Sequence, residues 1–349
     1  MNTTGNAALR DLGLTSPVIA APMAGGPSTP ALVVAAGSVG SLGFLAGGYR
    51  TTEALAEQIA SVRASAGGVP FGVNLFAPNP VPVDAAAFRS YADTLQPEAD
   101  PFGLNLREAP IVEDDDHWAD KIALLLADPV AVASFTFGIP AADTVAALRR
   151  AGTLVVQTVT NADEAKLAEA AGVDLLAVQA ASAGGHSGTL TPQRLPVDLP
   201  LVELLAQVRA AVALPLAAAG GLATPEAVTE ALAAGADAVM VGTVLLRADE
   251  SGASQPHRTA LADPARGDTV VTRAFTGRPA RALRNRFTER YSDLAPAGYP
   301  ALHYLTSPLR KASAAAGDPE LINLWAGTGY RHATAEPVAR ILTRLAGRA

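Results

Sequence analysis

The sequence predicts an α/β protein of the TIM (β/α)8-barrel class, with an excursion after the third strand and a helical extension at the C-terminus. Eight short apolar segments alternate with segments of helical periodicity, which indicates a parallel sheet that closes into a barrel. The chain of 349 residues is long enough for one barrel and an appendage. A doubly wound open sheet is the competing architecture, because a sequence pattern alone does not settle the number of strands.

The predicted strands are short and apolar, as in LLAV at residues 175–178, and the helices between them are amphipathic, with Leu55 and Ile59 on one face of the second. We expect Ser28 to cap the first helix. The strands start with VIAA after Pro17 and then span 41–46, 70–75, 130–136, 153–159, 174–179, 214–219 and 237–242. The helices span 29–36, 52–65, 115–127, 141–150, 162–170, 200–211 and 225–234.

Two parts of the chain depart from this alternation. Residues 77–116 hold a helix near 84–95 and a loop, which we expect to lie over one mouth of the barrel. After residue 268 the strand pattern stops, and helices are predicted at 305–316, 319–325 and 335–346. The chain therefore divides into a barrel of residues 1–267 and a helical extension of residues 268–349, which we expect to cover the substrate cavity.

Composition excludes several classes of partner and chemistry. The net charge is −7 and there is no run of Lys and Arg, so we expect no nucleic acid partner. The absence of cysteine removes disulfides, thiolate metal sites and thiol nucleophiles. No apolar run reaches the roughly 18 residues that span a bilayer, and the N-terminus has no signal pattern, so we expect a cytoplasmic protein with no membrane partner. A monomer and a homodimer both stay open.

One loop carries a strong functional signal. The segment DLLAVQAASAGGHSGT, residues 174–189, ends a strand at Gln179, continues almost entirely in Ala, Ser and Gly, and presents one histidine, His186. Because glycine has no Cβ, such a loop lets backbone N–H groups approach a flat or anionic ligand closely. The alternative interpretation is a small-residue turn with an incidental surface histidine.

The predicted carboxyl ends of the strands, where barrel enzymes place their reacting groups, carry no carboxylate and no lysine. This pattern argues against Schiff-base chemistry and against a Mg²⁺ or Zn²⁺ site. The acidic run 113–116 beside His117 suggests a metal site only weakly, since acids are favoured at the start of a helix by its dipole. We therefore expect no metal.

Small and amide residues at the strand ends favour a phosphorylated flat cofactor. Glycine ends two consecutive strands, at 220–221 and at 242, and loops in these positions commonly bind phosphate through backbone N–H groups. The side-chain amides of Asn74 and Gln179 can donate to and accept from the edge of a flavin ring. The alternative for both amides is hydrogen bonding within the turns at their own strand ends.

Five blocks of the sequence together resemble the nitronate monooxygenase family, formerly called 2-nitropropane dioxygenase. The blocks are PVIAAPMAGGPSTP, PFGVNLF, AVQAASAGGHSGT, LPLAAAGGLATPEAVTEALAAGADAVMVGT and TRAFTGRPAR, and the similarity runs from about residue 17 to about residue 330. The resemblance implies an FMN-containing TIM barrel that oxidises alkyl nitronates, and by extension neutral nitroalkanes, with O₂ to a carbonyl compound and nitrite. The implied partners are the small-molecule nitronate or nitroalkane and O₂.

The same resemblance implies roles for individual residues. His186 matches the catalytic histidine of the family. The matches to its FMN-binding blocks are Pro22, Met23, Asn74, Gln179, Gly184, Gly185, Gly220, Gly221, Met240, Val241, Gly242 and Thr243. Two positions depart from the family pattern, Ala20 and Thr328, where relatives often have Gln. These departures bear on the substrate pocket more than on the cofactor.

Within this reaction His186 can act in two ways. As an imidazolium or an N–H donor it would hold the nitro oxygens of a nitronate, and unprotonated it would remove the α-proton of a neutral nitroalkane, so a pKa near neutrality would suit both tasks. The main alternative function is an NAD(P)H-dependent flavin reductase of the enoyl-ACP reductase or quinone reductase type, which looks similar over the glycine blocks. A phosphate-ligand enzyme without flavin and a non-catalytic carrier are further alternatives.

Overall fold

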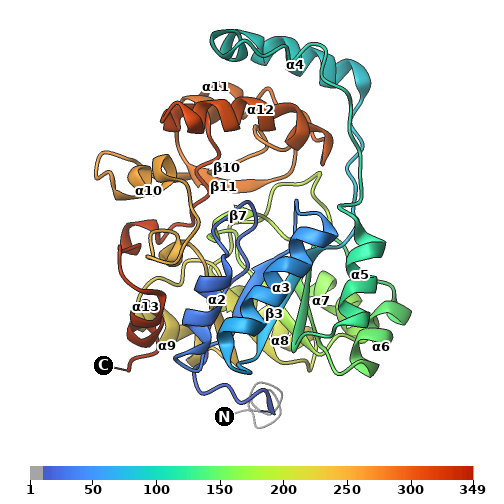
Figure 1. Cartoon of the computed structure of the whole chain (residues 1–349), viewed down its shortest axis with the longest axis vertical. Coiled ribbons are helices and arrows are strands. Elements are labelled where there is room, and N and C mark those ends of the chain that lie inside the picture. The colour runs from blue at the N-terminus through green and yellow to red at the C-terminus, as the bar shows by residue number, and fades with distance from the viewer. Residues whose placement is uncertain (1–10, 349) are drawn as a thin grey trace.

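The computed structural model describes residues 11–348, in which eight parallel strands close into a barrel (Figure 1). The strands neighbour one another in the order β1-β2-β3-β4-β5-β6-β8-β9, and β1 pairs with β9 through Ile19 and Met240 to close the ring. The predicted TIM barrel is confirmed, and the open sheet is wrong. The strands are β1 (Val18–Ala20), β2 (Gly43–Ala46), β3 (Phe71–Phe76), β4 (Val132–Thr136), β5 (Leu154–Val159), β6 (Leu175–Gln179), β8 (Leu216–Ala219) and β9 (Ala238–Val241).

Side-chain caps start several of the helices that surround the barrel, each accepting a backbone N–H three residues later. The predicted cap at Ser28 is wrong by one residue, because the side chain of Thr29 caps the helix. The Ser28 hydroxyl instead accepts the backbone N–H of Met23 at 2.9 Å and shapes the loop after β1. The other caps of this kind in the ring are Thr51, Asn161 and Thr224. The helices are α2 (Pro30–Gly37), α3 (Thr52–Ala66), α5 (Trp118–Ala127), α6 (Ala142–Arg150), α7 (Ala162–Ala170), α8 (Leu201–Ala211) and α9 (Pro225–Ala233).

The barrel interior is filled by side chains. Phe44, Val156 and Leu175 point inward and are almost completely buried, while their neighbours along the strands pack outward against the helices. Burying one such side chain contributes about 1.5–3 kcal/mol to stability. Because the interior is packed, a ligand can bind only at an end of the barrel.

The excursion after β3 lies on the C-terminal extension. Its helix α4 (Ala85–Ala99) buries Phe88 and Leu95 in one cluster with Phe275, Phe287 and Leu305 of the extension. Figure 1 shows α4 above α11 and α12, on the side away from the barrel. The expectation that the excursion covers a barrel mouth therefore fails for its helix, because the apolar face of α4 is buried against the extension.

The extension contains strands, so the prediction that strands stop after residue 268 is wrong. Strands β10 (Thr269–Thr272) and β11 (Ala280–Leu283) pair antiparallel, and β11 also pairs with the two-residue strand β7 (Gly185–His186). Both strands are short and lack the buried apolar run that marks the barrel strands, and β11 also depends on a partner segment almost 100 residues earlier. The three-stranded sheet joins the extension directly to the loop that carries His186.

The helices of the extension also differ in their bounds from the prediction. The helix predicted at 319–325 is a single 3-10 turn, η3 (Pro319–Leu321), because the chain then extends and Trp325 forms a bridge with Ala282. The last helix packs against the barrel beside α2 and α9, and no helix in residues 11–348 is long and apolar enough to cross a membrane. The helices are α10 (Gln255–Ala262), α11 (Arg286–Tyr291), α12 (Ala301–Ala315) and α13 (Val338–Leu345).

Candidate functional site

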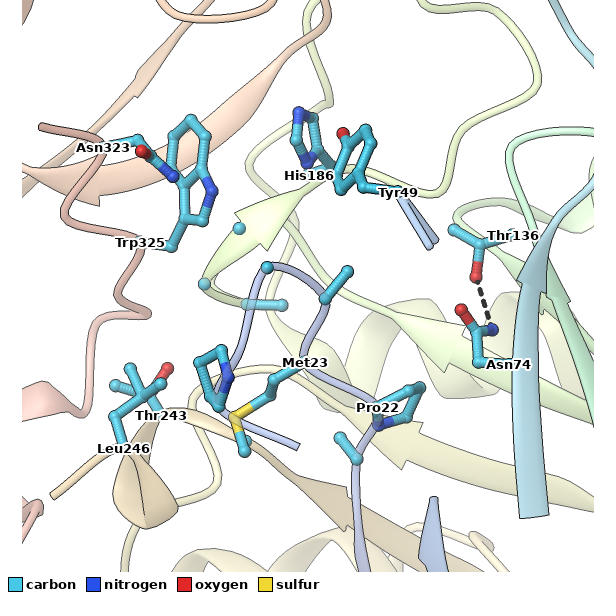
Figure 2. Close-up of a pocket in the computed structure, with 18 of the residues that line it drawn as sticks. Pro22, Met23, Tyr49, Asn74, Thr136, His186, Thr243, Leu246, Asn323 and Trp325 are labelled. Carbon is cyan, nitrogen blue, oxygen red and sulfur yellow. Dashed lines mark hydrogen bonds between the residues drawn. The ribbon is translucent and has the colours of Figure 1, made fainter. Parts of the chain in front are cut away.

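A cavity of about 730 Å³ lies at the carboxyl ends of the barrel strands, in the size range of cofactor and substrate sites. Figure 2 shows the loop after β1 on one side, His186 and Tyr49 on another, and Asn323 and Trp325 of the extension on a third. The structure brings every residue that the sequence singles out for the site into the lining of this one cavity. These residues are Pro22, Met23, Asn74, Gln179, Gly184, Gly185, His186, Gly220, Gly221, Met240, Val241, Gly242 and Thr243.

His186 is fixed by backbone pairing and by one side-chain hydrogen bond. As part of β7 it pairs with Ala280 of β11, and its Nε2 lies 2.9 Å from the hydroxyl Oγ1 of Thr276. The ring lies among aromatic side chains, with centroid distances of 5.2 Å to Trp325 and 5.7 Å to Phe137. The histidine is therefore held within the cavity wall, and the interpretation as an incidental surface residue is wrong.

The surroundings of His186 keep its imidazole neutral. Burial, followed by the positive charges of Arg278 and Arg310, lowers the pKa of His186 to about 3. The free protein thus lacks the near-neutral pKa that would suit both tasks, because the sequence does not reveal that the charges of two arginines of the extension act on this ring. At pH 7 the imidazole can accept a proton or donate its single N–H.

The two amides at the strand ends are used differently. Gln179 is occupied by the loop that follows it: its Nε2 donates to the carbonyl oxygen of His186 at 3.1 Å, and its Oε1 accepts the N–H of Gly188 at 2.7 Å. Asn74 donates its Nδ2 to Ser134 Oγ at 2.9 Å and to Thr136 Oγ1 at 3.1 Å (Figure 2). Gln179 therefore positions the His186 loop, while the Oδ1 of Asn74 remains available to a ligand.

The glycine-rich wall of the cavity offers backbone donors. Within residues 11–348, the N–H groups of Gly184, Gly221 and Gly242 have no hydrogen-bond acceptor. Gly221 has a φ of 73°, which favours glycine, and a Cβ at Gly184 would lie 2.4 Å from the backbone nitrogen of Gly327. Unpaired N–H groups in a tight concave wall are suited to a phosphate group.

The two departures from the family pattern do not line the cavity. Ala20 is completely buried and packs outward against the helices of the barrel. Thr328 donates its backbone N–H to the carbonyl oxygen of Ser182, and its side chain lies near Gly221. We therefore expect the substituent at 328 to affect the glycine wall more than the substrate end, contrary to the expectation from the sequence.

Several residues of the cavity lining escape the sequence analysis. Tyr49 follows β2, and its ring stacks on His303 of α12 at a centroid distance of 4.0 Å. Arg310 lies two helical turns after His303, and Asn323 and Trp325 follow η3. Only the tertiary fold brings these segments to the barrel, although the glycine pair before Tyr49 marks a strand end that could have suggested it.

The acidic run beside His117 has structural partners. Asp116 Oδ1 accepts the backbone N–H of Tyr49 at 2.9 Å, and Asp116 Oδ2 lies 2.8 Å from Nζ of Lys121, which also donates to the carbonyl oxygen of Gly47 at 3.0 Å. Burial raises the pKa of Asp116 and lowers that of Lys121, and their pairing opposes both shifts. This buried pair holds Tyr49 at a φ of 64° in the cavity wall.

We expect Lys121→Met to lower the free energy of unfolding by about 3 kcal/mol, because it leaves the buried Asp116 without its counter-charge. Urea denaturation of the two proteins measures the difference. Lys166→Met is the matched control, since the Lys166–Asp163 pair is exposed and its loss is expected to change stability by less than about 0.5 kcal/mol. Equal effects of the two substitutions would contradict the structural role of the buried pair.

A barrel whose open end holds a cavity of this size, with backbone donors on one wall and a neutral imidazole in another, belongs to the class of TIM-barrel enzymes that act on small molecules. The comparison with known proteins identifies which group of this class. The family model described as nitronate monooxygenase matches residues 6–347, and the chain belongs to the nitronate monooxygenase family. The protein is therefore an oxidoreductase.

Individual relatives agree with this assignment. A Staphylococcus aureus (strain Newman) protein named "Probable nitronate monooxygenase" is 34% identical over 339 residues, which cover 96% of this chain and 94% of that protein. The crystal structure of nitroalkane oxidase from Streptomyces ansochromogenes has a TM-score of 0.92 and 46% identity, covering 98% of this chain and 97% of that one. FabK from Thermotoga maritima, with a TM-score of 0.75 and 24% identity over 97% of this chain and 94% of its own, shares the fold.

Proposed function

We propose that this protein binds FMN and oxidises alkyl nitronates, and neutral nitroalkanes after their deprotonation, with O₂ to a carbonyl compound and nitrite. The observation that carries the proposal is the placement of His186, a neutral imidazole in the wall of the same cavity that holds the unpaired N–H groups of Gly221 and Gly242. Bound FMN would accept electrons from the nitronate and deliver them to O₂.

The lining of the cavity fits FMN. The N–H groups of Gly184, Gly221 and Gly242 would hold its phosphate, and the Oδ1 of Asn74 would accept a hydrogen bond from the edge of its ring. The extension of residues 268–349 would close the substrate end, since His303, Arg310 and Trp325 line the cavity there. The resulting site would have room for the cofactor and a small substrate.

The hydroxyl of Thr276 allows His186 to serve both substrate forms. When Nε2 carries the proton it donates to Thr276 Oγ1, and the lone pair of Nδ1 is then free to take the α-proton of a nitroalkane. When the Thr276 hydroxyl donates to Nε2, the Nδ1–H group can donate to a nitro oxygen of the nitronate. A nitronate that forms beside the ring raises its pKa, because a neighbouring negative charge favours the imidazolium.

We expect Thr276→Val to reduce kcat on a neutral nitroalkane by about tenfold, because Nε2 of His186 loses its hydrogen-bond partner and the ring its fixed orientation. Steady-state kinetics with a neutral nitroalkane measure the change. Thr276→Ser retains the hydroxyl and is expected to restore most of the activity. A Thr276→Ser enzyme as slow as Thr276→Val would show that shape, not the hydrogen bond, matters at this position.

Anaerobic mixing of the purified protein with a nitronate, and separately with NADPH, tests the proposed function. The nitronate is expected to bleach the flavin absorbance within seconds, and NADPH is expected to leave it unchanged over the same time. Bleaching by NADPH alone would overturn the proposal in favour of a flavin reductase. A colourless protein that binds no added FMN would overturn it altogether.

A further inference from the structure

Arg310 of α12 is a partly buried cation in the cavity wall, and its hydrogen-bond partners are all uncharged. Its Nε donates to Thr306 Oγ1 at 3.1 Å, its Nη1 to Asn323 Oδ1 at 3.0 Å, and its Nη2 to the carbonyl oxygen of His303 at 3.0 Å. These three contacts fix the plane of the guanidinium. The ion pairs among residues 11–348 do not include Arg310.

A second cation, Arg278, adds to the positive charge around His186. Its side chain is completely buried, its guanidinium carbon lies 3.9 Å from the centre of the Phe137 ring, and its Nη1 has no hydrogen-bond partner within residues 11–348. Burying a charge without a counter-ion is unfavourable. Arg278 lies behind the cavity lining and is offset in part by the charge of Glu164, but it forms no ion pair within residues 11–348. Its positive charge and that of Arg310 both act on His186 and favour an anion beside that ring.

The acids that line the cavity do not neutralise these arginines. Asp116 is paired with Lys121, and Asp114 Oδ2 accepts the hydroxyl of Tyr304 at 2.5 Å. Arg310 has a further N–H on Nη1 beyond the one that Asn323 accepts, and part of its surface faces the cavity. A cation with a free donor is therefore available to a ligand near His186.

We propose that Arg310 binds the substrate anion and makes the site prefer a nitronate over the neutral nitroalkane. This inference rests on the proposed function for the identity of the anion. A guanidinium donates to the oxygens of a planar anion and stays charged throughout the physiological pH range. A neutral nitroalkane offers the same oxygens with little charge, so it gains less from Arg310.

Binding of nitrate, a planar anion that is not oxidised, to the flavin-loaded protein tests the proposal without turnover. Calorimetric titration is expected to show nitrate binding to the wild type and a Kd raised about 10- to 100-fold in Arg310→Gln. Arg310→Lys is expected to have an intermediate Kd, because lysine retains the charge but lacks the paired N–H donors of a guanidinium. Arg150→Gln, at an exposed arginine of α6 remote from the cavity lining, is expected to leave the Kd unchanged.

The kinetic counterpart is a change in substrate preference. Arg310→Gln is expected to lower kcat/KM at least tenfold more for a nitronate than for its neutral nitroalkane. A nitrate Kd that is the same in the wild type, Arg310→Gln and Arg310→Lys would overturn the proposal, as would equal losses on both substrates. If the wild type binds nitrate through Arg310 but fails to oxidise a nitronate, the anion site stands and the proposed function falls.

Discussion

Replacing His186 by asparagine is expected to lower turnover of a neutral nitroalkane by about 10²- to 10⁴-fold, because it removes the proposed base for the α-proton. A preformed nitronate needs no base, and the asparagine amide can still donate to its oxygens. Its turnover is therefore expected to fall far less. FMN content is expected to stay the same, since the backbone N–H groups of Gly184, Gly221 and Gly242 are not changed by this substitution.

Parallel assays on a nitronate and its parent nitroalkane measure this difference, together with the flavin content of each preparation. His332→Asn, at an exposed histidine in the turn η4 (Tyr330–His332), is the matched control and is expected to leave both rates unchanged. Equal losses on the two substrates in His186→Asn would contradict the role of His186 as a base.

Acid is expected to destabilise the fold steeply below about pH 6.5, because desolvation holds three histidines in neutral form. Burial is the main cause that lowers the pKa of His186 to about 3 and that of His257 to about 4, and it lowers the pKa of His303 well below its usual value. The unfolded chain binds protons at these residues from about pH 6.5 downward, and the folded chain does not. The free energy of unfolding is therefore unaffected by the protonation of these histidines above that pH. Between that pH and about pH 4 it falls by about 1.4 kcal/mol per histidine and pH unit.

Urea denaturation at pH 7.5, 6 and 5 measures this dependence. His257→Gln is the informative variant, because an amide can still donate to the carbonyl oxygen of Trp325, which lies 3.0 Å from His257 Nε2. It is expected to remove about a third of the slope between pH 6 and pH 5. An unchanged slope in this variant would show that His257 does not take up a proton on unfolding.

The barrel could be predicted from the sequence because each of its units is local. A strand such as β6 is a run of apolar residues, the helix after it has its own periodicity, and threonine or asparagine caps mark several helix starts. The positions of the strand ends then follow from the barrel architecture, which explains why the sequence alone could assign Asn74, Gly221 and His186 to one cavity.

The remaining part of the site depends on contacts between distant segments. Strand β11 exists because it pairs with β7 and β10, and Arg310 reaches the cavity because it lies on the face of α12 whose His303 stacks on Tyr49. The pKa of His186 follows from these two arrangements together, since its causes are burial and the arginines at 278 and 310. A pattern in one short stretch of sequence reveals neither the pairing of β11 with β7 nor the position of Arg310.

The two-residue strand β7 connects His186 to both parts of the chain. Gln179 of the barrel donates a hydrogen bond to the carbonyl oxygen of His186, and Ala280 of the extension pairs with the His186 backbone. A polypeptide that stops at residue 267 would keep all eight barrel strands and both glycine turns, yet it would lack the strand against which Gly185 and His186 are extended. It would also lack α13, whose apolar face belongs to the core around the barrel. The orientation of the imidazole is therefore a joint product of barrel and extension, and neither part of the chain builds the site alone.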